Sequence, residues 1–566
     1  MFKYPKELLF LFLLILGLSL GSKLSAIDDR TVKSDPGIAK RVSTHLYTNG
    51  EPFAVLSASS LQNLLTQALK ISDNIYPKSS SILSMLAVSF LGSMQCPGVS
   101  EKTPCFLAFH YYQNTYNPIF VFHATKNCPL VRNLSLAGAT STNGLLIPFQ
   151  NTASTQATWY LYGSKDLLKL IAKDITSLAP YLSKKVVPST DLLNLTTKLK
   201  SCDFLSTLLP PPVQTIYTTF IKDAIDTLSC SVNVENNDLV CKIKVSPNSS
   251  SPWVTLIRAL ENSQKQHKFL KMEAEDDIQI CGFQSFDALK TCLENFAAKT
   301  QESFWRNDPT AHQIYLWGKC LYPLFTQLIE FSNDFFSGYY QCYQNLKREK
   351  NFILLQNVGL VELKSSKKAT ALQQNEALIS FLETFIKQTL HTQFLSAIQQ
   401  KLVGSEHLRT LNLRLDKAIV KDKNYTIHSL SFGINNENMC LNYPFVFSVY
   451  KDHLLYSDNL EDLRALIHRL EKNKWTYERL PFVQKNFINL GQILQKSGYF
   501  KAGAPLISKS NSSFEITYTT QTKPDSITVE MKIPLTFDNM FAYLQPMPFP
   551  KQQSDLNKQS VGIQSH

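Results

Sequence analysis

Two stretches of the sequence alternate strictly between apolar and polar residues, and each is followed by a helical pattern. The stretches are Cys230 to Val245 and Phe514 to Ile533, and the helical patterns cover Trp253 to Leu260 and Phe537 to Leu544. Successive side chains of a strand point to opposite faces, so each alternating stretch predicts a hairpin with one apolar and one polar face. A helix that covers the apolar face completes an antiparallel unit of the α+β class.

Other patterns recur in the same order along the chain. A hairpin predicted at 107–122 resembles one at 430–447, and a strand-to-helix pattern at 161–171 resembles one at 455–467. Both of these helical patterns carry an Asp in the first turn, where the helix dipole favours a negative charge. Ordered recurrence of this kind predicts a repeat architecture, here two tandem copies of one antiparallel-sheet-plus-helices module.

The predicted modules differ in length. The first covers 44–264 and the second 269–545, and the excess in the second is predicted to be a helical insertion at about 313–402. Each module is predicted to open with a strand and a helix, at 52–57 and 61–75 in the first and at 277–283 and 286–298 in the second. The polar tail at 551–566 lacks periodicity and is predicted to be disordered.

The first residues have the features of an export signal. Lys3 and Lys6 precede an apolar run from Leu8 to Leu16, and small residues follow from Gly17 to Ser22. This pattern predicts a signal peptide over 1–26, with an uncleaved N-terminal anchor as the alternative. The expected location is therefore outside the plasma membrane, in the periplasm or cell envelope, or secreted.

The charge of the chain is mildly basic. The formal net charge is +12 over 566 residues, and 18% of the residues are charged. Two short basic clusters, Lys347 to Lys350 and Lys364 to Lys368, lack the interleaved aromatic residues that bind single-stranded nucleic acid. No nucleic-acid partner is predicted, and the clusters are interpreted as solvated faces, with contact to an envelope protein or an anionic membrane surface as the alternative.

Eleven cysteines follow the leader, and no CxxC pair occurs among them. Disulfides persist in oxidising compartments, which an exported chain enters. Cys105 and Cys128 flank the first predicted hairpin, and Cys230 and Cys241 lie diagonally on one apolar face of another. These two pairs are the candidate disulfides, and the alternative is that all four are small buried apolar residues.

No catalytic, cofactor-binding or metal site is predicted. His110 and His123 are expected on one face of the first hairpin, offset by one diagonal step, but a metal site needs three or four ligands. The sequence has no GxSxG, HExxH, GxxxxGK[ST] or GxGxxG motif. No cofactor is predicted either.

The leader from Met1 to Gly21 and the Ser-, Leu-, Lys- and Phe-rich modules resemble exported proteins of chlamydia-like intracellular bacteria. The resemblance implies an envelope or secreted role and transfers no active-site residue. The favoured hypothesis is a non-catalytic protein whose duplicated modules form a binding or scaffolding surface. The alternative is an extracytoplasmic hydrolase with a motif-free active site between the modules, in which a carboxylate or His lies near a Ser, a Cys or a second carboxylate.

Overall fold

A computed structural model of the full chain provides the coordinates. The residues that it describes are 52–75, 81, 84–85, 88, 96–112, 115–140, 144–149, 157–171, 192–198, 217–222, 224–236, 238–266, 269–270, 277–299, 309–349, 352–364, 371–385, 412–421, 425–436, 439–472, 476–478, 482–497 and 515–534. The predicted leader, the predicted helix at 537–544 and the predicted tail at 551–566 lie outside these residues.

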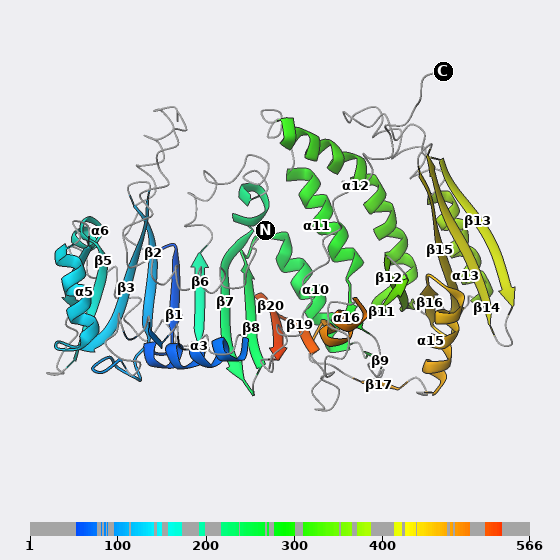
Figure 1. Cartoon of the computed structure of the whole chain (residues 1–566). Helices are drawn as coiled ribbons and strands as arrows, with labels where there is room; N and C mark the ends of the chain where they lie inside the picture. Colours follow the sequence, from blue (N-terminus) through cyan, green and yellow to red (C-terminus); the bar gives the residue numbers. More distant parts are fainter. Residues whose placement is uncertain are drawn as a thin grey trace, which may run out of the picture.

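One antiparallel sheet of 18 strands forms the centre of the described structure, with a separate two-stranded pair, β9 and β17 (Figure 1). Hydrogen-bonded neighbours in the large sheet follow the order β4-β5-β3-β2-β1-β6-β7-β8-β20-β19-β18-β10-β11-β12-β16-β15-β14-β13. The first eight of these strands come from residues before 250 and the other ten from residues after 275. The strands are β1 Ala54–Ala58, β2 Cys105–Tyr112, β3 Thr115–Thr125, β4 Gly144–Phe149, β5 Ala157–Ser164, β6 Leu193–Lys198, β7 Ile225–Glu235, β8 Asp238–Pro247, β9 Phe269–Leu270, β10 Ile278–Phe283, β11 Phe336–Glu349, β12 Phe352–Leu363, β13 Asn412–Lys421, β14 Thr426–Asn436, β15 Met439–Tyr450, β16 His453–Ser457, β17 Tyr477–Glu478, β18 Gln484–Asn489, β19 Glu515–Lys523 and β20 Ser526–Pro534.

Helices pack against this sheet, and none in the described residues combines the length and apolar character needed to cross a membrane. The helices are α3 Leu61–Ile75, α5 Pro129–Thr140, α6 Lys165–Ile171, the π-helix η4 Tyr217–Lys222, α10 Pro252–Gln266, α11 Phe286–Lys299, α12 Pro309–Phe335, α13 Ala371–Thr384, α15 Leu460–Lys472 and α16 Leu490–Ser497. Helices and a large antiparallel sheet together confirm the α+β class.

Several local predictions are confirmed. The predicted helix at 61–75 is α3, and the one at 286–298 is α11 with one further residue. In the hairpin β7–β8, Val232 lies opposite Cys241, so the predicted apolar side chains do share a face. In the hairpin β19–β20, Tyr518 lies opposite Met531, again as predicted.

Helix α15 illustrates why these local predictions succeed. Asn459 caps its start, because its side-chain oxygen accepts a hydrogen bond from the backbone N–H of Asp462 at 2.8 Å. Acidic residues occupy its first turn and basic residues its last, as the helix dipole favours. Its buried residues, Leu463, Leu466, Ile467 and Leu470, follow the i, i+3, i+4, i+7 spacing of one helix face.

The register defines two faces of the sheet, because residues directly opposite each other in a ladder share a face. We call the A face the one that carries Cys105 and Phe122 in the first half and Phe447 and Leu454 in the second. Helices α3 and α5 cover it at one end of the sheet, and α12 and α13 at the other. The opposite B face is covered by α6 at one end and by α15 at the other. The sheet is thus covered on both faces near each end.

The prediction of a helical insertion at 313–402 is wrong over its middle part. The region contains α12, the strands β11 and β12, and α13, and its remainder lies outside the described residues. The β11 sequence alternates, so that Tyr339, Gln341 and Tyr343 are each at most 1% exposed and point to the B face. Strand propensity of the aromatic residues and this period of two favour a strand over the helix that was predicted.

Candidate functional site

The first predicted cysteine pair lies in a larger group of buried sulfurs. Cys105 begins β2 and Cys128 precedes α5, and both are thiols in one apolar core that also contains Cys96. All three side chains are at most 6% exposed. Burial is the main cause that raises the pKa of Cys105, to about 12, so this thiol stays neutral at physiological pH. A bond between Cys105 and Cys128 remains a prediction.

The second predicted pair lies where the sequence placed it. Cys230 on β7 lies opposite Ile243, two residues from Cys241 on β8, so the two cysteines are diagonal neighbours on the A face. Both are thiols in the structure. Burial raises the pKa of both, and the charge of Cys230 adds to the rise for Cys241. A bond between them also remains a prediction.

The predicted offset between His110 and His123 is wrong. The register of β2 and β3 places His110 opposite Asn117, six residues along β3 from His123. At about 3.3 Å per residue the two rings are roughly 20 Å apart, so they cannot share a metal ion. In the part of the chain that the structure describes, no group of three or more His, Cys, Asp or Glu side chains is arranged to hold a metal.

Three histidines are nevertheless buried in the sheet. His110, His428 and His453 are 1%, 4% and 2% exposed, and burial is the main cause that lowers the pKa of each. The pKa falls to about 4 for His110 and for His453. Neither ring nitrogen of His110 has a hydrogen-bond partner, and His428 stacks on Phe447 with ring centroids 5.3 Å apart. These rings are neutral parts of the core.

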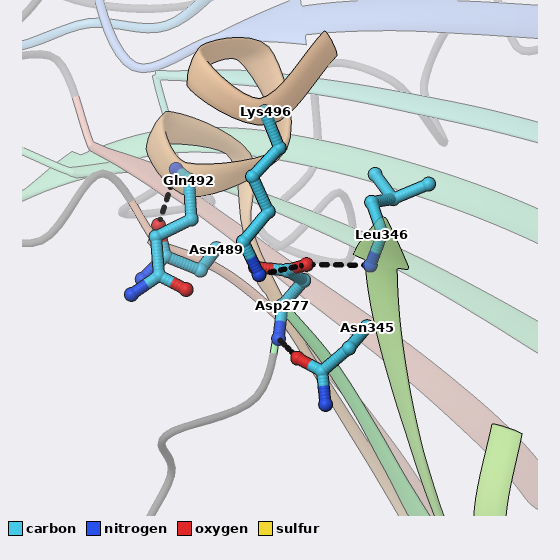
Figure 2. A network of polar contacts seen from close by, with 6 residues as sticks. All are labelled: Asp277, Asn345, Leu346, Asn489, Gln492 and Lys496. Atoms are coloured by element: carbon cyan, nitrogen blue, oxygen red, sulfur yellow. Dashed lines mark hydrogen bonds and ion pairs between the residues drawn. The ribbon is translucent and has the colours of Figure 1, made fainter. Parts of the chain in front are cut away.

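A buried carboxylate connects three elements of the second half (Figure 2). Asp277 lies just before β10 and is fully buried, and its oxygens accept hydrogen bonds from Lys496 Nζ of α16 at 2.7 and 2.8 Å. The backbone N–H of Leu346 on β11 donates to the same carboxylate at 2.7 Å. Its own backbone N–H donates to Asn345, and its carbonyl accepts from Asn489. Both carboxylate oxygens and both backbone polar groups of Asp277 have protein partners, as expected for a structural ion pair.

One pocket lies between α12, α13 and the end of β12. It has a volume of about 140 Å³ and is lined by Asp334, Phe335, Leu363, Lys364, Gln373, Gln374 and Ala377. These residues include one carboxylate and no His, Ser or Cys. This pocket therefore does not have the composition expected of the hypothetical hydrolase site.

The A face of the middle strands has exposed apolar side chains. Leu195, Cys230, Ile243 and Val529 lie opposite one another on β6, β7, β8 and β20, and we call this row the central apolar row. Leu195 is 37% exposed and Ile243 is 42% exposed. The neighbouring B-face residues are polar, and Lys242 pairs with Glu530 across the same two strands at 3.4 Å. The sheet is thus apolar on one side and polar on the other at the junction of its two halves.

Comparisons with known proteins give no family. No protein-family model matches the sequence, and no curated protein matches it. Solved structures of TP0453 in crystal forms IV, I and III are 11%, 9% and 10% identical over 36%, 40% and 40% of this chain and 81%, 90% and 89% of theirs. Their TM-scores are 0.20, 0.21 and 0.20, so this similarity carries no argument about fold or function.

Sequence reasoning missed Asp277 and Cys96 as connected residues. Asp277 was assigned only to the start of a strand, and its partner Lys496 lies 219 residues away. Cys96 has a local signal, because Pro97 and Gly98 follow it and this pair is typical of a tight turn. The sequence does not indicate what that turn packs against.

Proposed function

We propose that the chain is an exported, non-catalytic protein of the cell envelope. In this proposal its two halves are copies of one α+β module, and the surface at their junction binds an apolar partner. The observation that carries the proposal is the central apolar row, in which Leu195 and Ile243 are exposed and Cys230 and Val529 are half-buried, in the middle of a sheet whose ends are covered on both faces.

The strand order supports the duplication. Counted outward from the junction, the first half runs β8-β7-β6-β1-β2-β3-β5-β4, and the second runs β20-β19-β18-β10-β11-β12-β16-β15 before β14 and β13. Matching the strands by position also matches them in chain order. Helices agree as well, since α3 and α11 follow the matched strands β1 and β10, and α6 and α15 follow β5 and β16.

This match revises one part of the predicted repeat. The hairpin β2–β3 corresponds by position to β11–β12, and not to β14–β15 at 430–447. The three other sequence correspondences keep their partners. In this alignment the pair β13–β14, inserted before β15, has no counterpart between α5 and β4 among the described residues of the first half.

The two halves are joined by extensive contacts. Strand β8 pairs with β20 over eight residue pairs, from Ile527 opposite Val245 to Pro534 opposite Asp238. Helix α10 follows β8 of the first half and packs on β19, β20 and β10 of the second. Figure 1 shows α10 leaving the end of β8 and crossing toward the strands of the second half. A surface at this junction is therefore held on a continuous sheet.

An exposed apolar row on such a sheet supports a binding role. Large apolar side chains lose favourable free energy while they face water, at about 25 cal/mol for each Å² left uncovered. Contiguous apolar surface of this kind is characteristic of binding sites for proteins or lipids. The adjacent row Leu193, Val232, Cys241 and Met531 extends it on the same face.

Fractionation of cells that express the chain naturally, followed by N-terminal sequencing, tests export. The expected result is protein in the envelope or secreted fraction with the first 21 to 26 residues removed. Recovery from the cytosol with Met1 in place would overturn the proposal.

A photo-cross-linking residue placed at Ile243 tests the surface in intact cells. The matched control places it at Lys244, which is also exposed but points to the B face. The expected result is a discrete adduct at position 243 that is absent at 244 and is lost when Leu195→Lys is added. Equal adducts at both positions, or none at 243, would contradict the proposed binding surface.

A further inference from the structure

The group of three buried cysteines contains a more specific pairing than the sequence suggested. Cys96, Cys105 and Cys128 share one core with residues of α3 and α5. The sequence left Cys96 out, because it lies nine residues before the first hairpin. The structure brings it to the open end of that hairpin, beside the residues at the end of β3.

The backbone before Val99 runs antiparallel to the end of β3. Val99 bridges Ala124, and the backbone N–H of Thr125 donates to the Gly98 carbonyl at 2.8 Å. Both segments leave this bridge in turns, Cys96 to Val99 on one side and Thr125 to Cys128 on the other, so the two turns lie side by side.

The turn at Cys96 is pressed directly against Cys128. The N–H of Val99 donates to the Cys96 carbonyl, and Gly98 has a φ of +82°, which closes a Pro-Gly turn. A Cβ added to Gly98 would lie 2.7 Å from the Cβ of Cys128. Only glycine permits this approach, so the turn and the start of α5 are in van der Waals contact.

Cys96 itself is held in an unfavourable conformation. Its φ of +45° lies in the left-handed region, which a residue with a Cβ rarely adopts. Such strain persists where surrounding structure over-determines it, and it often occurs at functional positions. Here it directs a side chain that is 2% exposed into the core that contains the other two sulfurs.

Electrostatics agree with this proximity. Burial first, and then the charge of Cys128, raises the pKa of Cys96 to about 11. Cys96 in turn contributes to the raised pKa of Cys105. Cys96 is thus electrostatically coupled to both of the other sulfurs.

We infer that Cys96 and Cys128, in place of the pair Cys105 and Cys128 expected from the sequence, form a disulfide when the chain folds in an oxidising compartment, and that Cys105 stays a thiol beside it. Cys96 lies in a turn and Cys128 at a helix start, so neither backbone is held in a strand ladder. Cys105 is fixed in the ladder opposite Ala58. The occurrence of the bond in the cell rests on the proposed export.

The reaction is thiol–disulfide exchange with a small disulfide donor. One cysteine thiolate attacks the donor and forms a mixed disulfide, and the second thiolate then displaces the remaining donor thiol. The two protein thiols give two electrons and two protons to the donor, which leaves as two thiols. The exchange takes place before the core closes, because the folded protein buries both sulfurs.

Trypsin separates the three cysteines, which allows direct mapping. Cleavage after Lys102, Lys126 and Arg132 places Cys96, Cys105 and Cys128 on different peptides. The full chain is refolded with oxidised glutathione, alkylated under denaturing conditions and digested without reduction. The expected mass spectrum contains a peptide that links 96 to 128, together with Cys105 alkylated at least 10-fold more than the other two.

Variants and location separate the outcomes. The linked peptide is expected to disappear in Cys96→Ser and in Cys128→Ser and to persist in Cys105→Ser. A bond from Cys105 to either cysteine, or equal alkylation of all three, would overturn the inference. Because the refolding is done in vitro, its result does not depend on export. A bond that forms in vitro and is absent from protein isolated from cells would contradict only the proposed location.

Discussion

Replacing Asp277 by Asn tests whether the buried ion pair holds the second half together. The substitution keeps the size of the side chain and removes its charge. The carboxylate accepts three hydrogen bonds, two from Lys496 and one from the backbone of Leu346. The amide retains one acceptor oxygen and presents an NH₂ group to the remaining donors.

These contacts set the expected decrease in the free energy of unfolding. Loss of charge assistance at Leu346 costs about 1 kcal/mol, and loss of the Lys496 contact costs about 1 to 3 kcal/mol. Breaking a fully buried pair costs about 3 to 5 kcal/mol, but Lys496 is 39% exposed and can turn toward water. A total of about 2 to 4 kcal/mol is therefore expected.

Native-state hydrogen exchange at the Leu346 amide measures this cost locally. Each 1.4 kcal/mol changes the equilibrium constant for opening tenfold, so exchange at this amide should accelerate by roughly 30- to 700-fold when it occurs through opening of the structure. The control is Asp287→Asn, because Asp287 is exposed and accepts a hydrogen bond from Asn333. Its cost should stay below about 1 kcal/mol. Acceleration below about 3-fold in Asp277→Asn, or equal effects of the two variants, would refute the reasoning.

Further outcomes follow from other described residues. In the folded protein the pKa values of His110 and His453 are about 4, below the value of about 6.5 in the unfolded chain. The unfolded chain therefore binds protons first, and the contribution of each neutral His to the free energy of unfolding is complete above about pH 6.5. As the pH drops toward 4, this free energy falls by about 1.4 kcal/mol per pH unit for each His. Urea midpoints measured against pH should show a shallower decline in His110→Leu, and an unchanged slope would contradict this. Gly338→Ala should destabilise the protein by about 2 kcal/mol or more, because Gly338 has a φ of +101° and the added Cβ would clash with a backbone oxygen. In α12, a Cβ added at Gly318 meets nothing within 4 Å, so Gly318→Ala should stabilise the protein by about 0.5 to 1 kcal/mol. Thermal melts of the two variants that shift in the same direction would be inconsistent with these placements. Asn459→Ala removes the cap of α15 and should cost about 1 kcal/mol, measured by urea unfolding, and a neutral result would mean that the cap is not formed.

The elements predicted well from the sequence are those whose signal is local. Helices α3, α11 and α15 carry their own apolar spacing, and the hairpins β7–β8 and β19–β20 carry an alternating pattern and a short turn. Strand β11 was mistaken for a helix because its alternation follows directly on the long helix α12. The boundary between the two periods falls at Phe335 and Phe336, where no proline interrupts the chain.

The candidate site residues show the same division. Periodicity placed Cys230 and Cys241 correctly, because a single hairpin sets their relation. It misplaced His123 relative to His110, because the turn lies before Thr115 and each residue of register moves the pairing along the strand. It left Cys96 unassigned, because a bridge between Val99 and Ala124 brings this cysteine to Cys128.

By itself the sequence determined the α+β character of the chain, its amphipathic helices and its two alternating hairpins, since the free energy of burying one face of a helix or hairpin is encoded in nearby residues. Only the tertiary structure decided that β8 pairs with β20, that Asp277 meets Lys496, and that the central apolar row forms on one face. These relations join residues up to several hundred positions apart. Backbone hydrogen bonding is the same for every pair of strands, so the choice of partner and register depends on how the whole set of faces can be buried together.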